Sequence, residues 1–320
     1  MDSFDPFFKN PHLSTLAGNF WARPKSERRW PVQSVLYQTE PNVQVLVHSQ
    51  RPDGEPLGEL ILAHGLEGSS DSQYMLGIAA KGLAAGMNVV RMNQRNCGGT
   101  DGLSPTLYHS GRSQDVAAVA QNLLQQDRVS RFALAGYSMG GNLVLKLAGE
   151  WGRQGPPQFR AVAAVCPAMN LAASADALHL PGNRLYEYHF MWKLRSRLRA
   201  KARLFPEVFD TSRLRGLTSL RDFDDKITAY YCGFDGASDY YEQSAAANVV
   251  DRIAVPALIL HAANDPFIRI LPETRQKILS NPNISFVETA DGGHCSFLAE
   301  PDGDDGHWAE RQVMEFLRGF

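Results

Sequence analysis

The chain has few cysteines, and none of them are close together in sequence. No C-x-x-C pair occurs, and no set of cysteines and histidines has the spacing of a zinc-binding motif. Widely separated thiols are typical of a reducing compartment, where disulfides are rare. We therefore expect reduced thiols, no disulfide framework and no metal. The four positions are Cys97, Cys166, Cys232 and Cys295.

An excess of charge of either sign is also missing. The 320 residues include 32 Lys and Arg and 34 Asp and Glu, which leaves a formal net charge of −2. A nucleic-acid-binding protein normally carries a basic excess, so we expect no nucleic-acid partner. No uninterrupted apolar run is long enough to cross a membrane. The N-terminal stretch lacks a basic region followed by an apolar one, so we expect no secretory signal and a cytoplasmic protein.

Motifs of cofactor-dependent and metal-dependent enzymes are absent as well. The sequence contains no H-E-x-x-H motif, no phosphate-binding loop and no dinucleotide fingerprint. We accordingly expect no cofactor. With 44% hydrophobic and 21% charged residues, the composition is that of an ordinary globular protein.

Apolar strand-like runs alternate with helical patterns along most of the chain, which predicts a mostly parallel, doubly wound α/β sheet with helices on both faces. An irregular arm is expected over 4–31, followed by two antiparallel strands at 32–38 and 43–50. We treat 1–320 as a single domain. The strands expected after the first two are 59–63, 88–93, 132–135, 161–166, 257–261 and 284–288, and the helices are 71–85, 113–126, 142–151, 273–279 and 307–317.

The alternation stops between 167 and 251, where the pattern is helical and rich in aromatic and basic residues. This insertion follows the strand after 142–151. Loops at the carboxyl ends of parallel strands border the ligand site in α/β proteins. We therefore interpret 167–251 as a helical cap over the site.

A G-x-S-x-G pattern lies between the expected strand at 132–135 and the helix that follows it. In Gly136-Tyr137-Ser138-Met139-Gly140, the serine would occupy a sharp strand-to-helix turn, and the glycines would relieve the close approach of strand and helix. Such a turn exposes the serine hydroxyl to a base. Ser138 is therefore the candidate nucleophile.

Later in the chain, an aspartate and a histidine complete a candidate triad in the order Ser, Asp, His. Asp265 lies at the end of the stretch LILHAANDPF, just after a buried strand. His294 follows two glycines just beyond the next strand. A histidine can accept the serine proton when an acid orients it. Asp291 and Asp235 are rival acids, but neither ends an expected strand.

Backbone amides are the expected donors to the oxyanion. One is the N–H of Met139, directly after the nucleophile, and the other is the N–H of Leu66, in the loop after 59–63. His64 is interpreted as an organiser of that loop. Cys97 and Cys295 are not on a strand-to-helix turn, which argues against a cysteine nucleophile.

Aromatic residues beside the triad and in the cap are candidates for the substrate pocket. The cap segment 184–205 also carries seven Lys or Arg residues. Aromatics packed inward with cations in water are one interpretation of it; weak contact with a lipid interface or an anionic substrate is the other. The candidate pocket residues are Tyr137, Tyr186, Phe190, Trp192 and Phe267.

Motifs spread from Phe4 to Leu298 resemble the YheT-like α/β-hydrolases, the AB hydrolase-4 carboxylesterase family related to the abhydrolase-domain lipases. The resemblance implies an ester-hydrolysing triad at Ser138, Asp265 and His294, a cap over an acyl pocket, and no cofactor. Asn96 stands where the family pattern leads us to expect glycine, and asparagine tolerates a left-handed backbone. The matching stretches are NPHLSTL, HGLEGSSDSQY, NQRNCGG, LYHSG, GYSMGGN, LYEYHF, FDDKITAYYCGFDGASDYY, LILHAANDPFI and GGHCSF.

The sequence thus predicts a serine carboxylesterase that hydrolyses short- to medium-chain acyl esters through an acyl-enzyme. An acyltransferase, a thioesterase or an acylglycerol lipase could use the same triad. A non-catalytic binding module is a third alternative, disfavoured because all three triad residues are in place. The expected partner is a small-molecule acyl ester.

Overall fold

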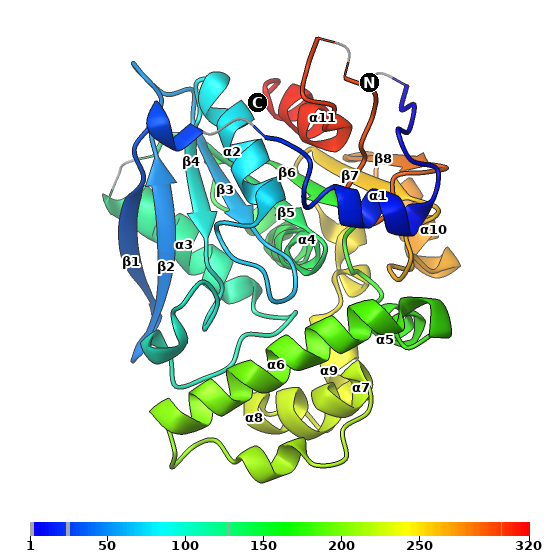
Figure 1. The fold of residues 1–320 in the computed structure, drawn as a ribbon. Coiled ribbons are helices and arrows are strands. Elements are labelled where there is room, and N and C mark those ends of the chain that lie inside the picture. The colour runs from blue at the N-terminus through cyan, green and yellow to red at the C-terminus, as the bar shows by residue number, and fades with distance from the viewer. Residues whose placement is uncertain (1–2, 24–25, 127–128, 302) are drawn as a thin grey trace.

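An eight-stranded sheet forms the centre of the computed structural model, which describes residues 3–23, 26–126, 129–301 and 303–320 (Figure 1). The strand order is β1-β2-β4-β3-β5-β6-β7-β8. The β1–β2 and β2–β4 pairs are antiparallel, and every pair from β4 to β8 is parallel. The predicted mostly parallel α/β sheet is confirmed.

Strand and helix bounds lie within a few residues of the expected ones over most of the chain. The strands are β1 (Gln33–Glu40), β2 (Val43–Gln50), β3 (Glu59–Ala63), β4 (Asn88–Met92), β5 (Phe132–Tyr137), β6 (Phe159–Val165), β7 (Ala257–Ala262) and β8 (Ile284–Thr289). The helices outside the β6–β7 segment are α1 (Pro11–Ala17), α2 (Gln73–Ala84), α3 (Ser113–Gln126), α4 (Met139–Trp151), α10 (Pro272–Ser280) and α11 (Trp308–Leu317).

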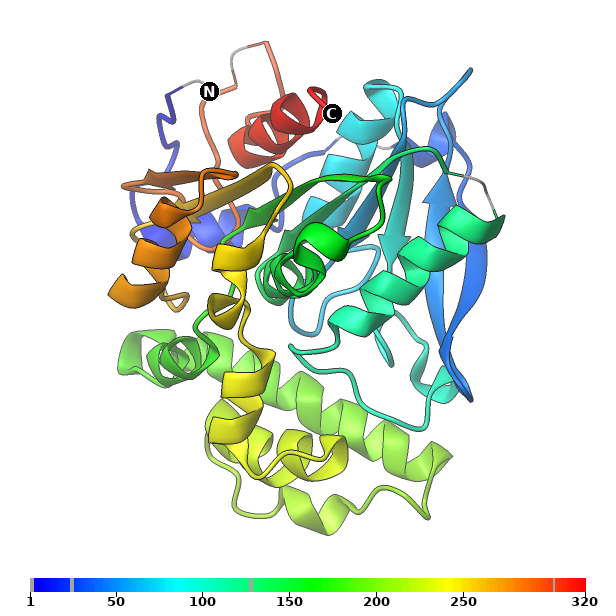
Figure 2. The ribbon, with the colours of Figure 1, turned by 180° about the vertical axis from the view of Figure 1, so that it is seen from behind.

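Helices cover both faces of the sheet, as Figures 1 and 2 show from opposite sides. Leu123 of α3, Leu143 of α4 and Ile278 of α10 belong to one buried cluster. Ile78 of α2 and Val313 of α11 belong to the cluster on the other face. Burial on both faces explains why the central strands read as continuous apolar runs.

The parallel strands deliver the candidate site residues to one edge of the sheet. Ala63 pairs with Gly136 near the carboxyl ends of β3 and β5, and Tyr137 pairs with Val165 at the ends of β5 and β6. The loops after β3, β5, β7 and β8 therefore leave the sheet on the same side. Ligands of α/β proteins bind at this edge.

Between β6 and β7 the chain forms helices and, in this fully described stretch, no strand. These helices lie beyond the carboxyl edge of the sheet (Figure 1). They are α5 (Leu171–Leu178), α6 (Arg184–Leu204), α7 (Leu220–Phe223), a π-helical turn (Asp224–Ala229), α8 (Tyr230–Cys232) and α9 (Ala237–Ser244). We call residues 167–251 the cap below. In the part of the chain that the structure describes, no helix has the length and apolar character needed to cross a membrane.

The prediction of an irregular arm over 4–31 is wrong in one part, because helix α1 forms there. The side chain of Asn10 accepts hydrogen bonds from the backbone N–H groups of His12 and Leu13, and Pro11 occupies the first helical position. Asparagine before proline is a helix-start signal, so this helix could have been predicted. Residues 24 and 25 of the arm lie outside the described residues.

Candidate active site

Ser138 occupies a turn that only small neighbours permit. Its φ and ψ are 55° and −120°, a left-handed conformation that non-glycine residues rarely adopt. A Cβ on Gly136 would lie 2.2 Å from the carbonyl oxygen of Gly140, and one on Gly140 would lie 2.2 Å from that of Ala63. The glycines on either side of the serine are therefore required by packing between β3, β5 and α4.

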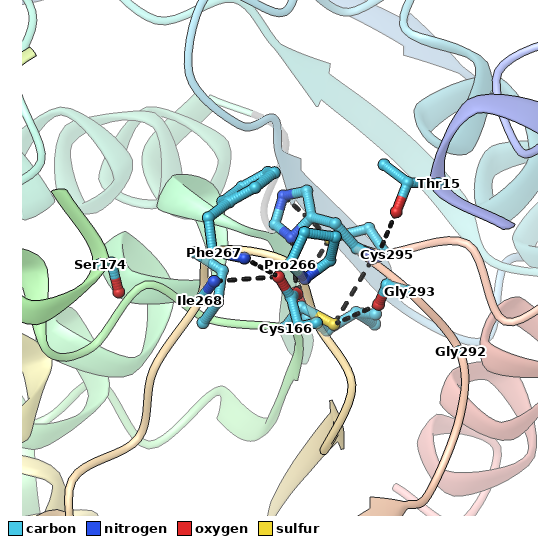
Figure 3. A network of polar contacts seen from close by, with 12 residues as sticks. Thr15, Cys166, Ser174, Pro266, Phe267, Ile268, Gly292, Gly293 and Cys295 are labelled. Carbon is cyan, nitrogen blue, oxygen red and sulfur yellow. Dashed lines mark hydrogen bonds and ion pairs between the residues drawn. The ribbon is translucent and has the colours of Figure 1, made fainter. Parts of the chain in front are cut away.

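Asp265 and His294 form a hydrogen-bonded pair at the ends of neighbouring strands. Nδ1 of His294 lies 2.8 Å from Oδ2 of Asp265. The other oxygen of Asp265, Oδ1, accepts the backbone N–H groups of Phe267 and Ile268 at 3.1 and 2.9 Å (Figure 3). Burial alone would raise the pKa of Asp265, but His294 and these hydrogen bonds lower it overall. Asp265 is thus a fixed anion at neutral pH.

The loop that carries His294 is held by α1 as well as by the triad acid. The backbone N–H of His294 donates to Oγ1 of Thr15 at 2.8 Å. Gly293 has a φ of 60°, and a Cβ there would lie 2.7 Å from the carbonyl oxygen of Pro11. The Phe267 ring packs 4.4 Å from the His294 ring, centre to centre. The unexpected helix α1 therefore shapes the site.

Among the described residues, no hydrogen bond joins the side chains of Ser138 and His294. Nε2 of His294 instead lies 3.8 Å from Sγ of Cys295. That thiol contacts the carbonyl oxygen of Val165 at 3.5 Å, the same oxygen that accepts the N–H of Ser138 at 2.9 Å. Because Asp265 occupies Nδ1, Nε2 is the nitrogen that remains to accept a proton. Catalytic hydrogen bonds are often long before substrate binds.

The Cys295 thiol and the His294 imidazole shift each other's pKa. Burial would raise the pKa of Cys295, but contact with Cys166 and His294 lowers it to about 6. Burial would lower the pKa of His294, but Cys295 and Asp265 raise it well above its ordinary value. The protonation of Cys295 and that of the candidate base His294 therefore depend on each other, which sequence spacing did not reveal.

The two expected oxyanion donors, the backbone N–H groups of Leu66 and Met139, are free of hydrogen-bond acceptors among the described residues. Both residues line one cavity together with Ser138. A Cβ on Gly65 would lie 3.2 Å from Cβ of Ser138, so the loop after β3 approaches the serine closely. Unoccupied donors beside a nucleophile suit an oxyanion.

Glu67, which sequence reasoning missed, anchors this loop to the cap. It has a φ of 54°, and its carboxylate accepts Nε and a terminal nitrogen of Arg197 at 2.7 and 2.8 Å. The hydroxyl of Tyr108 donates to the same carboxylate at 2.7 Å. Only 13% of the Arg197 side chain and 4% of the Glu67 side chain are exposed. A buried two-point ion pair therefore joins α6 to the residue after Leu66.

Replacing Arg197 with methionine should lower the free energy of unfolding by about 3–5 kcal/mol, because the Glu67 carboxylate would stay buried without its partner. Methionine keeps much of the side-chain volume. Denaturant unfolding checks the prediction. The control is Arg199→Met, the same change at an exposed position of the same helix. Adding Glu67→Gln should recover part of the loss, since the unpaired charge disappears; fully additive losses would contradict this account.

Other polar residues near the site organise loops, as the sequence indicated for His64. Nε2 of His64 accepts the N–H of Gln94 at 3.1 Å, so its Nδ1 donates to the carbonyl oxygen of Gly65 at 2.8 Å. Burial lowers the pKa of His64 to about 4, which keeps it neutral. Arg95 pairs with Asp115 through two hydrogen bonds. His109 accepts the N–H of Gly111, and Asn96 has the left-handed φ of 65° expected for it.

The cavity beside Ser138 is lined mostly by apolar side chains from the cap. Of the candidate pocket aromatics, Phe190 and Phe267 line it. Tyr186 contacts Phe267 with ring centres 5.3 Å apart but is not part of the lining. The other apolar lining residues are Leu66, Leu107, Met139, Ala168, Leu171, Ala175, Leu178, Leu194, Leu198, Leu220, Phe223 and Ile268.

Tyr137 and Trp192 lie away from the cavity, and helix and strand geometry explains why. Tyr137 follows the strand alternation of β5, which turns its ring toward Tyr74 in the cluster under α2 and α11. Trp192 is 59% exposed. It lies two positions from Phe190, on the opposite side of α6, because successive helical residues are rotated by about 100°. Closeness in sequence to Ser138 or Phe190 therefore did not predict which aromatic residues line the cavity.

Asp224, which also lines the cavity, is a buried carboxyl whose pKa is raised to about 6, mainly by burial. Tyr241 and Thr228 each donate a hydrogen bond to it at 2.8 Å. The folded protein therefore holds a proton between about pH 4 and 6 that the unfolded chain releases, so this group makes stability fall as pH rises through that window.

An Asp224→Asn variant should lose this dependence. Its free energy of unfolding, relative to wild type, should rise by about 2 kcal/mol between pH 4 and pH 7. Denaturant unfolding of both proteins across that range measures the difference directly. Parallel curves for the two proteins would contradict the assignment.

A serine on a strand-to-helix turn of a mostly parallel sheet, with an acid and a histidine after later strands, defines the α/β-hydrolase class. The chain belongs to the family described as alpha/beta hydrolase fold, which matches residues 59–301. The expected resemblance to YheT-like proteins is confirmed.

Two relatives and one solved structure of similar fold illustrate the comparison. "Putative esterase YheT" of Escherichia coli (strain K12) is 29% identical over 97% of this chain and 91% of its own length. Phospholipase ABHD3 of Mus musculus is 30% identical over a region that covers 75% of this chain and 58% of that protein. The solved esterase Pf2001 of Pyrococcus furiosus covers 93% of this chain and 94% of its own, with a TM-score of 0.61 and 17% identity. The two relatives thus bear the names of an esterase and a phospholipase.

Proposed function

We propose that the chain is a serine carboxylic ester hydrolase that acts on short- to medium-chain acyl esters. The arrangement that carries the proposal is the Asp265–His294 hydrogen bond at the sheet edge that also presents Ser138. The names of several relatives, which are esterases, lipases and phospholipases, support the same class of reaction.

In this mechanism Ser138 attacks the ester carbonyl while Nε2 of His294 takes the hydroxyl proton. Asp265 holds Nδ1 protonated and stabilises the imidazolium that forms. The amides of Leu66 and Met139 bind the oxyanion. His294 then gives its proton to the leaving alcohol, and a water activated by the same nitrogen releases the acid from Ser138.

The cavity supports an apolar acyl group. Phe190, Leu194 and Phe267 lie on the same lining as Ser138, and burial of methylene groups against such walls contributes about 0.8 kcal/mol each. We therefore expect kcat/KM to rise with acyl length over the first members of a p-nitrophenyl ester series and then to fall when the chain outgrows the cavity.

Covalent labelling tests the nucleophile independently of substrate choice. A fluorophosphonate should modify Ser138, identified by mass spectrometry of the labelled peptide, because only an activated serine reacts readily with this reagent. A binding module with an inert site would remain unlabelled. Product analysis in the presence of competing alcohols separates hydrolysis from the acyltransferase alternative.

A second candidate, hydrolysis of esters presented at a lipid surface, rests on an exposed apolar face. Leu185, Tyr188 and Trp192 are 84%, 72% and 59% exposed, and their spacing places them on one side of α6. Helix α1 contributes Leu13 and Leu16, which are 55% and 50% exposed. Exposed apolar residues among basic ones are typical of surfaces that contact lipid.

Serine substitutions at Leu185 and Tyr188 test this candidate. Together they should lower binding to anionic phospholipid vesicles about tenfold, because burial of two such side chains is worth 1.5 kcal/mol or more. Vesicle co-sedimentation measures the change. Hydrolysis of a soluble short-chain ester should be unaffected. Equal vesicle binding by both proteins would remove the argument for a lipid surface.

A further inference from the structure

Two thiols lie close to the imidazole of His294, and one of them, Cys295, contacts its free nitrogen. Cys166 directly follows β6, and Cys295 directly follows His294. One ligand atom from each of Cys166, His294 and Cys295 lies within 4.8 Å of the other two. The backbone N–H of Cys295 donates to Sγ of Cys166 at 3.4 Å, as Figure 3 shows. The triad mechanism uses neither thiol.

The spacing is close to that of a tetrahedral metal centre. Zinc binds thiolate sulfur at about 2.3 Å and imidazole nitrogen at about 2.0–2.1 Å, so the two ligand atoms lie about 3.5–3.6 Å apart around the ion. Nε2 of His294 and Sγ of Cys295 are 3.8 Å apart. This pair would need to contract by a few tenths of an ångström, and the Cys166 thiol, which lies within 4.8 Å of both other ligand atoms, by up to about an ångström.

The orientation of the imidazole is also that of a metal ligand. Nδ1 of His294 is bound to Asp265 at 2.8 Å, which leaves Nε2 as the coordinating atom. A carboxylate on the far nitrogen is the usual outer partner of a zinc-bound histidine. The backbone fixes the thiols too, since Cys166 and Cys295 both have positive φ, 43° and 60°, and Cys166 donates its N–H to Leu260 at 2.7 Å.

A second overlapping group, Cys166 with His261 and Asp265, is entirely buried. The group with His294 and Cys295 is different, because 13% of the His294 side chain is exposed. An ion can therefore reach this group through the exposed part of the His294 side chain. Two sulfur ligands and one nitrogen favour a soft or borderline cation such as Zn²⁺ or Cd²⁺ over Mg²⁺ or Ca²⁺.

We propose that Cys166, Cys295 and Nε2 of His294 form a binding site for a zinc-like divalent cation, with water as the fourth ligand. Binding requires both thiolates and an unprotonated Nε2, so whatever protons these three groups carry are released to solvent. It also occupies the nitrogen that would accept the Ser138 proton, so the metal and the proposed esterase reaction exclude each other. Only this last consequence rests on the proposed function.

Cobalt substitution tests the site without reference to activity. Co²⁺ added to the reduced full-length protein should produce a thiolate-to-cobalt charge-transfer absorption, with one ion bound per chain, that Zn²⁺ abolishes. Cys295→Ser should lose the band. Cys232→Ser, which removes a half-buried cap thiol, should keep it. Absence of the band in wild type, or its persistence in Cys295→Ser, overturns the proposal.

A second measurement needs no variant. Zn²⁺ should slow alkylation of Cys295 by iodoacetamide about tenfold or more, because a coordinated thiolate is withdrawn from reaction. Peptide mass spectrometry follows Cys295 and Cys232 in the same sample. Equal protection of both thiols, or of neither, would contradict a specific site.

Enzyme assays then separate the two proposals. Stoichiometric Zn²⁺ should suppress ester hydrolysis by wild type, EDTA should restore it, and Cys295→Ser should resist the metal when compared with its own metal-free rate. A protein that binds Co²⁺ but never hydrolyses esters refutes the esterase and leaves the metal site standing. A protein that hydrolyses esters, shows no cobalt band and resists Zn²⁺ refutes the metal site alone.

Discussion

A Ser138→Ala variant should hydrolyse p-nitrophenyl esters with kcat reduced by a factor on the order of 10⁵–10⁶. The substitution removes the attacking oxygen and leaves the rest of the site in place. Residual acceleration over water, about 10³–10⁴, should remain because the Leu66 and Met139 amides and the cavity still bind the substrate. Steady-state kinetics on the purified variant measure the loss.

The matched control is Ser174→Ala. Ser174 also lines the cavity and is buried, and its hydroxyl accepts the N–H of Arg269 at 3.2 Å. It touches no triad residue that the structure describes, so kcat should change only several-fold. A Ser138→Ala variant as fast as wild type would refute the proposed nucleophile.

Asp265→Asn should lower kcat about 10⁴-fold with little change in KM. Oδ1 of Asp265 accepts two backbone N–H groups, from Phe267 and Ile268. The amide oxygen of asparagine must take that place, because an NH₂ group cannot accept them. The amide nitrogen then faces Nδ1 of His294 and donates to it. That forces the proton onto Nε2, so His294 can no longer accept the proton of Ser138.

Asp291→Asn is the comparison for this prediction, since Asp291 is the rival acid near His294. Its Oδ1 accepts the side-chain amide of Asn264 at 2.9 Å. Asparagine can preserve the local contact after rotation, so kcat should fall less than tenfold if Asp265 is the acid. A larger loss in Asp291→Asn than in Asp265→Asn would reverse the assignment.

The sheet could be predicted because its determinants are local. The buried strands β6 and β7 contain the apolar runs 161–165 and 257–260. The glycines around Ser138 reflect contacts within the strand-turn-helix unit and with the end of β3. Helix α1 was missed although its Asn10-Pro11 start was readable, because few of its residues are buried and its apolar pattern is weak.

The candidate site divides in a similar way. Asp265 and His294 were predictable because each follows a strand end, and parallel strands bring their ends to one edge. The Glu67–Arg197 pair was not, since 130 residues separate its partners and their meeting depends on how the cap docks. The pocket aromatics were predicted from residue type alone, which cannot tell the inner side of α6 from its outer side. Phe190 and Trp192 therefore received the same assignment.

The ion pair between Glu67 and Arg197 couples the position of α6 to the conformation of the loop at Leu66. Any ligand that favours the docked position of α6 also favours the present shape of the loop at Leu66, because the same pair is common to both. By linkage, an oxyanion bound at that loop must favour docking of the cap by an equal free energy. In the proposed esterase, the packing of the cap around an acyl chain and the binding of an oxyanion at Leu66 are therefore coupled through this pair.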